Sequence, residues 1–79
     1  MYCVRDSKAE IYNNPFFSIT HAEAERTFQS AVRDPKTKVG QYPEDFDLYY
    51  VGTYDDNTGK IMPTDSPQHI VKGINLVTQ

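Results

Sequence analysis

The side chains most able to do chemistry are a group of carboxylates, two histidines and one thiol. The carboxylates gather within one short stretch, at Glu44, Asp45, Asp47, Asp55 and Asp56. Asp55, Asn57 and Gly59 share part of the pattern of a calcium-binding loop. The glycine, however, comes one position too early, and no glutamate stands at the later ligand position. We therefore expect no metal site and no cofactor.

The histidines and the cysteine show no catalytic pattern. His21, His69 and Cys3 lie in unrelated sequence contexts without metal-ligand spacing, and no activating base stands beside the thiol. We expect Cys3 to be a small buried hydrophobic residue and the protein not to be an enzyme. A single cysteine also excludes an intramolecular disulfide, which fits a reducing compartment.

Basic and aromatic residues suggest a different kind of site. Arg33, Lys36 and Lys38 cluster in sequence, where they would either stabilise a helix C-terminus by about 0.3–1 kcal/mol or contact phosphates. Tyrosines beside such cations could stack on bases, at about 1–3 kcal/mol per base, although a tyrosine in a small domain can equally belong to a core or an interface. The candidate nucleic-acid-binding residues are Arg5, Lys8, Arg33, Lys36, Lys38, Tyr49 and Tyr50.

Length and charge limit what these residues can do. The chain has 79 residues, which predicts a single domain over 1–79. A domain of this size buries only about 60% of its unfolded surface, so we expect self-association. The net charge of −3 argues against nucleic-acid binding through bulk charge alone. No signal peptide or apolar run of about 20 residues is present, so we expect no membrane association.

The best-specified element is a helix over 21–33. Thr20 and Glu23 form a capping box, and Ile19 and Ala24 occupy the two positions of a hydrophobic staple. One apolar stripe follows at helical spacing, made of Ala24, Phe28, Ala31 and Val32. Asp34-Pro35 ends the helix, because the residue before proline is disfavoured in the α region.

Strand signals surround this helix. We predict strands over Met1–Arg5, over Phe16–Ile19 with Phe17 and Ile19 on one face, and over Asp47–Tyr54. Glu10–Asn14 is polar and is predicted to be a connection. Gly52 suggests a bulge, which leaves open which of the neighbouring tyrosines face the core.

The second half of the chain is predicted to hold a hairpin. Asp55–Gly59 forms its turn, with glycine in the left-handed region, and Lys60–Met62 is a return strand that Pro63 ends. Ser66–Gln79 is ambiguous between a short helix and a last strand at Ile74–Leu76. The whole predicts an α+β fold: a two-layer sandwich with one main helix on a mostly antiparallel sheet of about four strands. The sheet face that the helix does not cover must be exposed to solvent or covered by a partner.

Several segments in order also resemble one known family. They lie between about residues 2 and 64 and comprise Val4–Glu10, Pro15–Phe17, the helix with Arg26 and Phe28, Tyr42–Tyr49, Val51-Gly52 and Tyr54–Gly59. Together they resemble the small nonstructural, DNA-binding-type protein of gokushovirus-like microviruses, which are single-stranded DNA phages. The resemblance implies a protein of the bacterial host's cytoplasm that binds single-stranded DNA or switches phage DNA replication towards packaged single strands.

The sequence is compatible with two functions. The first is a nonenzymatic protein that binds single-stranded DNA. The alternative is an interaction module that binds a host or phage replication protein without touching nucleic acid. Its acidic surface, at Glu44, Asp45, Asp55 and Asp56, would suit a basic partner.

Overall fold

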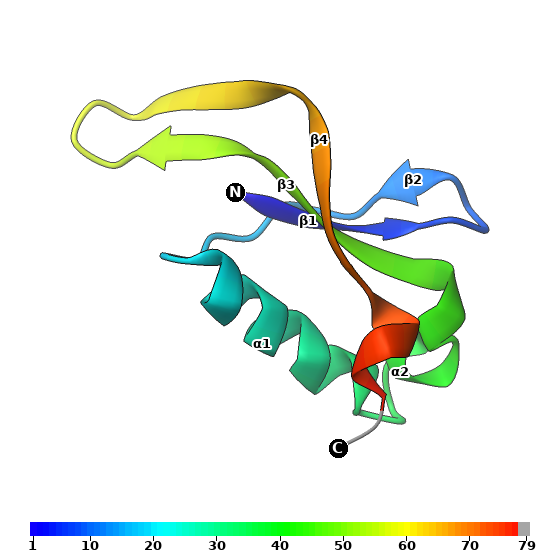
Figure 1. Ribbon diagram of the computed structural model, residues 1–79. Helices are drawn as coiled ribbons and strands as arrows, with labels where there is room; N and C mark the ends of the chain where they lie inside the picture. Colours follow the sequence, from blue (N-terminus) through cyan, green and yellow to red (C-terminus); the bar gives the residue numbers. More distant parts are fainter. Residues whose placement is uncertain (78–79) are drawn as a thin grey trace.

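The computed structural model describes residues 1–77, within which four strands form one antiparallel sheet of order β2-β1-β3-β4. A single long helix, α1, lies across one face of this curled sheet (Figure 1). The α+β prediction of one main helix on an antiparallel sheet is confirmed. The strands are β1 (Tyr2–Asp6), β2 (Ile11–Tyr12), β3 (Phe46–Asp55) and β4 (Lys60–Lys72), and the helices are α1 (His21–Val32), α2 (Lys38–Gln41) and the short 3-10 helices η1 (Pro43–Asp45) and η2 (Gly73–Leu76).

Helix α1 forms as its cap and its apolar spacing predict. The Thr20 hydroxyl accepts a hydrogen bond from the Glu23 amide at 3.1 Å, which satisfies one of the free amides of the first turn. Ala24, Phe28 and Val32 are buried against the sheet. The staple prediction is wrong, because the Ile19 side chain is 91% exposed. Arg33 caps the helix, which ends one residue earlier than predicted.

The core lies between α1 and the near face of the sheet. It is closed at the far end by η2, which contributes Leu76. Phe28 and Leu48 are the largest side chains that are fully buried in the described residues. The core residues are Tyr2, Ala24, Phe28, Val32, Phe46, Leu48 and Leu76. So small a core leaves stability sensitive to each of its members.

Strand β2 was not predicted. It forms because the chain turns sharply after β1, where the buried carboxylate of Asp6 accepts hydrogen bonds from the Lys8 and Ala9 amides at 3.0 and 3.2 Å. Glu10 then takes a φ of 58°, in the left-handed region. Neither glycine nor proline occupies this turn, which the Asp6 side chain stabilises instead.

The strand predicted over Phe16–Ile19 is wrong. Only Phe16 pairs with the sheet, through an isolated bridge to Tyr2. Phe16 is packed against the core, while Phe17 and Ile19 are 60% and 91% exposed, so these side chains do divide as predicted although no strand forms. The segment instead runs across the end of the sheet towards the start of α1 (Figure 1).

Strand β3 and the hairpin that follows are confirmed. The Gly59 amide donates to the Asp55 carbonyl at 2.7 Å, and Gly59 has a φ of 76°. The predicted bulge at Gly52 appears as a register shift between Tyr50 and Gly52. A Cβ at Gly52 would lie 2.5 Å from the Met62 carbonyl oxygen, so this crossing of β3 and β4 requires glycine.

Strand β4 is much longer than predicted. It continues past Pro63 to Lys72, so neither a helix from Ser66 nor a strand at Ile74–Leu76 forms, and the latter segment lies in η2. Proline is tolerated because β4 is an edge strand, where a missing amide leaves no partner unpaired. The predicted ambiguous segment ends at residues 78 and 79, which lie outside the described residues.

The connection between α1 and β3 holds a short helix, α2. The Thr37 hydroxyl donates towards the Ala31 and Asp34 carbonyl oxygens and accepts from the Gly40 amide at 2.9 Å, which ties α2 to the end of α1.

In the described part of the chain, no helix is both long enough and apolar enough to cross a membrane.

Cys3 is buried, as expected, and burial raises the pKa of its thiol. Burial, with a smaller effect from Tyr50, likewise raises the pKa of the Tyr2 phenol. Desolvation lowers the pKa of the amino terminus, which donates to the Gly52 carbonyl oxygen. Each shift links stability to pH.

We expect the free energy of unfolding to fall as pH rises above about 8.5, where a thiol in the unfolded chain ionises but folded Cys3 does not. Tyr2 adds to the fall above about pH 10. The amino terminus acts in the opposite direction below about pH 8, so the measurement starts above that value. Urea midpoints across this range check the prediction. The Cys3→Ala variant should lose the first part of the decline, and a midpoint that is constant or rises would contradict it.

Candidate nucleic-acid interface

The sheet face turned away from α1 carries a set of polar and aromatic side chains. Alternation along β1 and β3 directs Tyr2, Val4 and Leu48 towards α1. Their sequence neighbours therefore point to the opposite face, and strand pairing adds residues from β2 and β4 to it. We call this the open face, and it comprises Cys3, Arg5, Tyr12, Asp47, Tyr49, His69 and Lys72.

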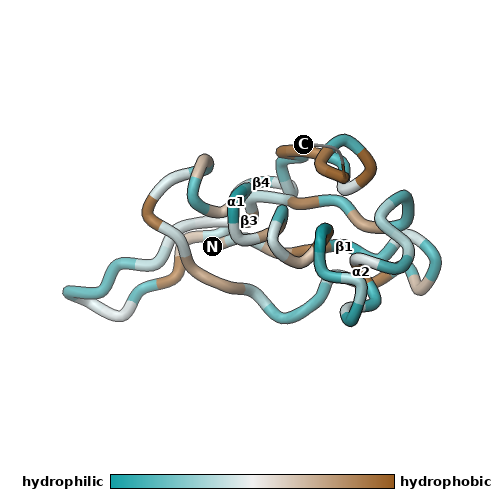
Figure 2. The backbone as a smooth tube through the Cα atoms, turned by 90° about the horizontal axis from the view of Figure 1, so that it is seen from below, coloured by the Kyte–Doolittle hydropathy of each residue, from teal (hydrophilic) through white to brown (hydrophobic). Residues whose placement is uncertain are grey.

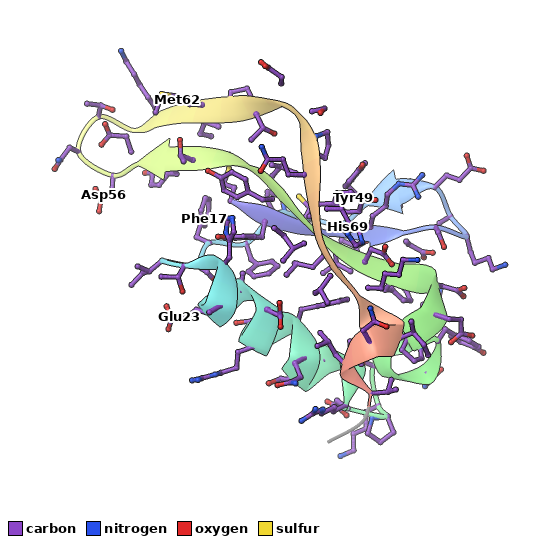
Figure 3. The ribbon with its side chains drawn as sticks, viewed as in Figure 1. Phe17, Glu23, Tyr49, Asp56, Met62 and His69 are labelled. Carbon is purple, nitrogen blue, oxygen red and sulfur yellow. The ribbon has the colours of Figure 1, made fainter. Side chains whose placement is uncertain are left out.

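Four of these side chains form a continuous row across the sheet. The Arg5 guanidinium carbon lies 5.6 Å from the centroid of the Tyr12 ring. The Tyr12 and Tyr49 ring centroids are 5.4 Å apart, edge to face. The Tyr49 and His69 centroids follow at 5.3 Å, again edge to face. Figure 3 labels Tyr49 and His69 on the side of the sheet away from α1.

The row is accessible and is held in place by its neighbours. Tyr12 is 43% exposed, and the His69 side chain is 40% exposed. His69 Nε2 lies 2.7 Å from the Asp47 carboxylate, which orients the imidazole against Tyr49. A bulge at Ile70 brings His69 opposite Tyr49, since Leu48 pairs with Val71 while Tyr49 pairs with His69.

Charge on the open face differs from that of the whole chain. Arg5 stands at one end of the row, and Lys72 lies opposite Asp47 on the neighbouring strand. Their two positive charges meet the negative charge of Asp47. A chain with a net charge of −3 therefore carries a locally cationic surface, with ring edges and faces beside it.

Such a surface suits a flexible polyanion with exposed bases. Rings on a sheet face offer platforms on which unpaired bases stack whatever their sequence, while flanking cations contact the backbone. Duplex DNA keeps its bases stacked inside the helix, so the same rings would have little to bind.

The residues predicted for binding lie on different sides of the sheet. Arg5 and Tyr49 share the open face, whereas Tyr50 points towards α1. The Tyr50 ring lies 5.4 Å from Tyr2 and 5.0 Å from His21, centroid to centroid. The register of β3 explains the difference, because adjacent residues of a strand face opposite sides.

The remaining predicted cations lie elsewhere. Lys8 is exposed in the turn between β1 and β2. Arg33, Lys36 and Lys38 lie at the end of α1 and the start of α2, on the other side of the sheet from the open face (Figure 1). Arg33 Nε donates to the Leu76 carbonyl oxygen at 2.9 Å and so fastens η2 to α1. These cations do not gather beside the open-face rings.

Sequence reasoning missed Tyr12, His69 and Lys72. Tyr12 lies in β2, which the polar residues around it concealed. His69 and Lys72 lie in the part of β4 beyond two prolines. The one available signal was the β-branched and aromatic pair Ile11-Tyr12, which has strand-forming character.

The acidic residues of the alternative function do not form one surface. Glu44 and Asp45 precede β3, while Asp55 and Asp56 follow from its other end. Asp55 is the last residue of the ten-residue strand, so the two pairs lie at opposite ends of β3, roughly 30 Å apart. Asp55 organises the hairpin turn, where its carboxylate accepts from the Asn57 amide at 2.9 Å.

Comparison with known proteins places this chain in a family. Residues 1–76 match the family described as Phage ORF5 protein. The chain belongs to the Phage ORF5 protein family. It is 36% identical over 70 residues to Protein ORF5 of Chlamydia phage 1, a microvirus, covering 82% of this chain and 72% of that protein. No solved structure matches. The expected kinship with a small nonstructural microvirus protein is thus confirmed.

Proposed function

We propose that this member of the Phage ORF5 protein family is a nonenzymatic protein that binds single-stranded DNA through its open face. The observation that carries the proposal is the row Arg5–Tyr12–Tyr49–His69, which is continuous across the sheet and exposed at Tyr12 and His69. Membership of a phage family supports it, because single strands of a phage genome would be the ligand. Binding them in the host cytoplasm would favour their packaging over further duplex replication.

Fluorescence anisotropy with a labelled oligothymidylate tests the proposal. If Arg5 and Lys72 each contact one phosphate, log affinity should fall with log salt at a slope of about −1.4. A duplex of mixed sequence should compete poorly. Because the chain has a net charge of −3, we expect binding to be strongest at low ionic strength. If nothing binds at low salt, the proposal fails.

A failure would favour the alternative, a module that binds a host or phage replication protein. Pull-down from a host lysate treated with nuclease distinguishes the two. A partner retained after nuclease treatment, together with no oligonucleotide binding, would support the alternative.

Removing the open-face carboxylate should strengthen DNA binding. Asp47 places one negative charge beside the proposed phosphate path, and a unit charge at 4 Å contributes about 1 kcal/mol in water. We expect Asp47→Asn to raise affinity up to about 5-fold at low salt. Asp56→Asn, at the distant hairpin tip, is the matched control. Equal effects from both variants would show that only net charge matters.

A further inference from the structure

The outer half of the β3–β4 hairpin projects beyond the layer formed by α1 (Figure 1). Among the described residues, the core and the side chains packed on it include none of β3 beyond Tyr50 and none of β4 before Ile70. A two-stranded hairpin is at best marginally stable in water when nothing covers it. Its own chain covers this hairpin only in part, through Phe17, and leaves its apolar side chains largely exposed.

The hairpin side that faces α1 is apolar. The Phe17 ring lies 5.4 Å from that of Tyr54, centroid to centroid, and Tyr54 pairs directly with Ile61. Ile19 and Tyr54 also line a pocket of about 320 Å3 at the base of the hairpin, together with the polar side chains of Ser18, Thr20 and His21. We call Phe17, Ile19, Tyr54 and Ile61 the hairpin patch; they are 60%, 91%, 49% and 59% exposed.

The surroundings of the patch are polar. Figure 2 shows a hydrophilic hairpin tip with a hydrophobic stretch of the return strand close behind it. Figure 3 shows Phe17 between the hairpin and the start of α1, with Asp56 at the tip and Glu23 on the helix. An apolar centre with a charged rim is the usual organisation of a protein interface.

The chain exposes more surface than is usual for a monomer of its mass. The chain exposes 5453 Å2. A folded monomer of 9.1 kDa is expected to expose roughly 4,900 Å2, so the excess is roughly 550 Å2. A standard interface buries about 800 Å2 on each partner. The excess is thus of the size that one modest isologous contact would cover.

We infer that a second copy of this chain covers the hairpin patch and that the protein is a twofold dimer through it. Pairing through a sheet edge is disfavoured, because β2 has two residues and β4 carries Pro63, Pro67 and two bulges. Packing of patch against patch remains, and it needs only one self-complementary surface. The open face lies on the other side of the sheet and stays free.

Sedimentation velocity from about 1 to about 200 µM protein tests the inference by mass action. The wild-type chain should pass from monomer to dimer. Ile19→Glu should weaken dimerisation by more than about 10-fold, because it places a charge at the centre of the contact. Since Ile19 is 91% exposed, the substitution removes little packing within the monomer. Ile74→Glu is the matched control, at a 45% exposed isoleucine of η2 outside the patch.

Ile61→Glu provides a second variant on the opposite side of the patch, and thermal melting provides a second measurement. The wild-type melting temperature should rise with protein concentration, while that of Ile19→Glu should not. A wild-type chain that is monomeric throughout overturns the inference. So does a dimer that survives both Ile19→Glu and Ile61→Glu, or one that Ile74→Glu dissociates equally. No DNA is present, so these results are independent of the DNA-binding test.

Discussion

The Phe28→Ala variant is expected to be largely unfolded at 25 °C. Phe28 is 1% exposed in the centre of the interface between α1 and the sheet. Truncating a buried phenylalanine costs about 3–5 kcal/mol, through lost burial and the cavity left behind. A single core in a domain of this size supplies only about 3–5 kcal/mol in all. Far-UV circular dichroism with a urea titration measures the loss.

The control for this variant is Tyr42→Ala. Tyr42 is an aromatic residue that is 49% exposed, between α2 and η1. Its truncation should cost less than about 1 kcal/mol, as is usual for exposed positions. A cooperative melt of Phe28→Ala within a few degrees of the wild type would show that the core does not depend on α1 in the way that the structure indicates.

Tyr49→Ala is expected to lower affinity for oligothymidylate about 5- to 150-fold, which corresponds to about 1–3 kcal/mol for one stacked base. Tyr49 stands at the centre of the row, in ring contact with both Tyr12 and His69. The substitution therefore removes one ring on which a base can stack, and it also removes a packing contact from the Tyr12 and His69 rings. Anisotropy at low salt measures the effect. Tyr49→Phe keeps the ring and should retain most of the affinity.

Two further variants make this result interpretable. Tyr12→Ala removes a more exposed ring of the same row and should also weaken binding, while the half-buried Tyr49 ring keeps its contact with His69. Tyr42→Ala, outside the open face, should bind like the wild type. If Lys36→Ala reduces the salt slope while Lys72→Ala does not, the phosphate contacts belong to the end of α1 rather than to the open face.

Local signals in the sequence were sufficient for several elements. Helix α1 followed from its cap at Thr20 and from apolar residues at helical spacing, both of which act within a few turns of chain. The hairpin at Asp55–Gly59 followed from a glycine suited to positive φ. These elements were predictable because the groups that stabilise them are neighbours in the sequence.

The open face depends on contacts that only the tertiary structure makes. Tyr12 reaches it because β1 and β2 pair through a turn organised by a buried Asp6 carboxylate. His69 reaches it because β4 is an edge strand that tolerates proline and because a bulge shifts its register. The sequence alone therefore determined the helix, the main strand and the hairpin. The fold decided which cations and rings meet, because strand pairing over long sequence distances, and the one-residue shifts within it, choose the face of each side chain.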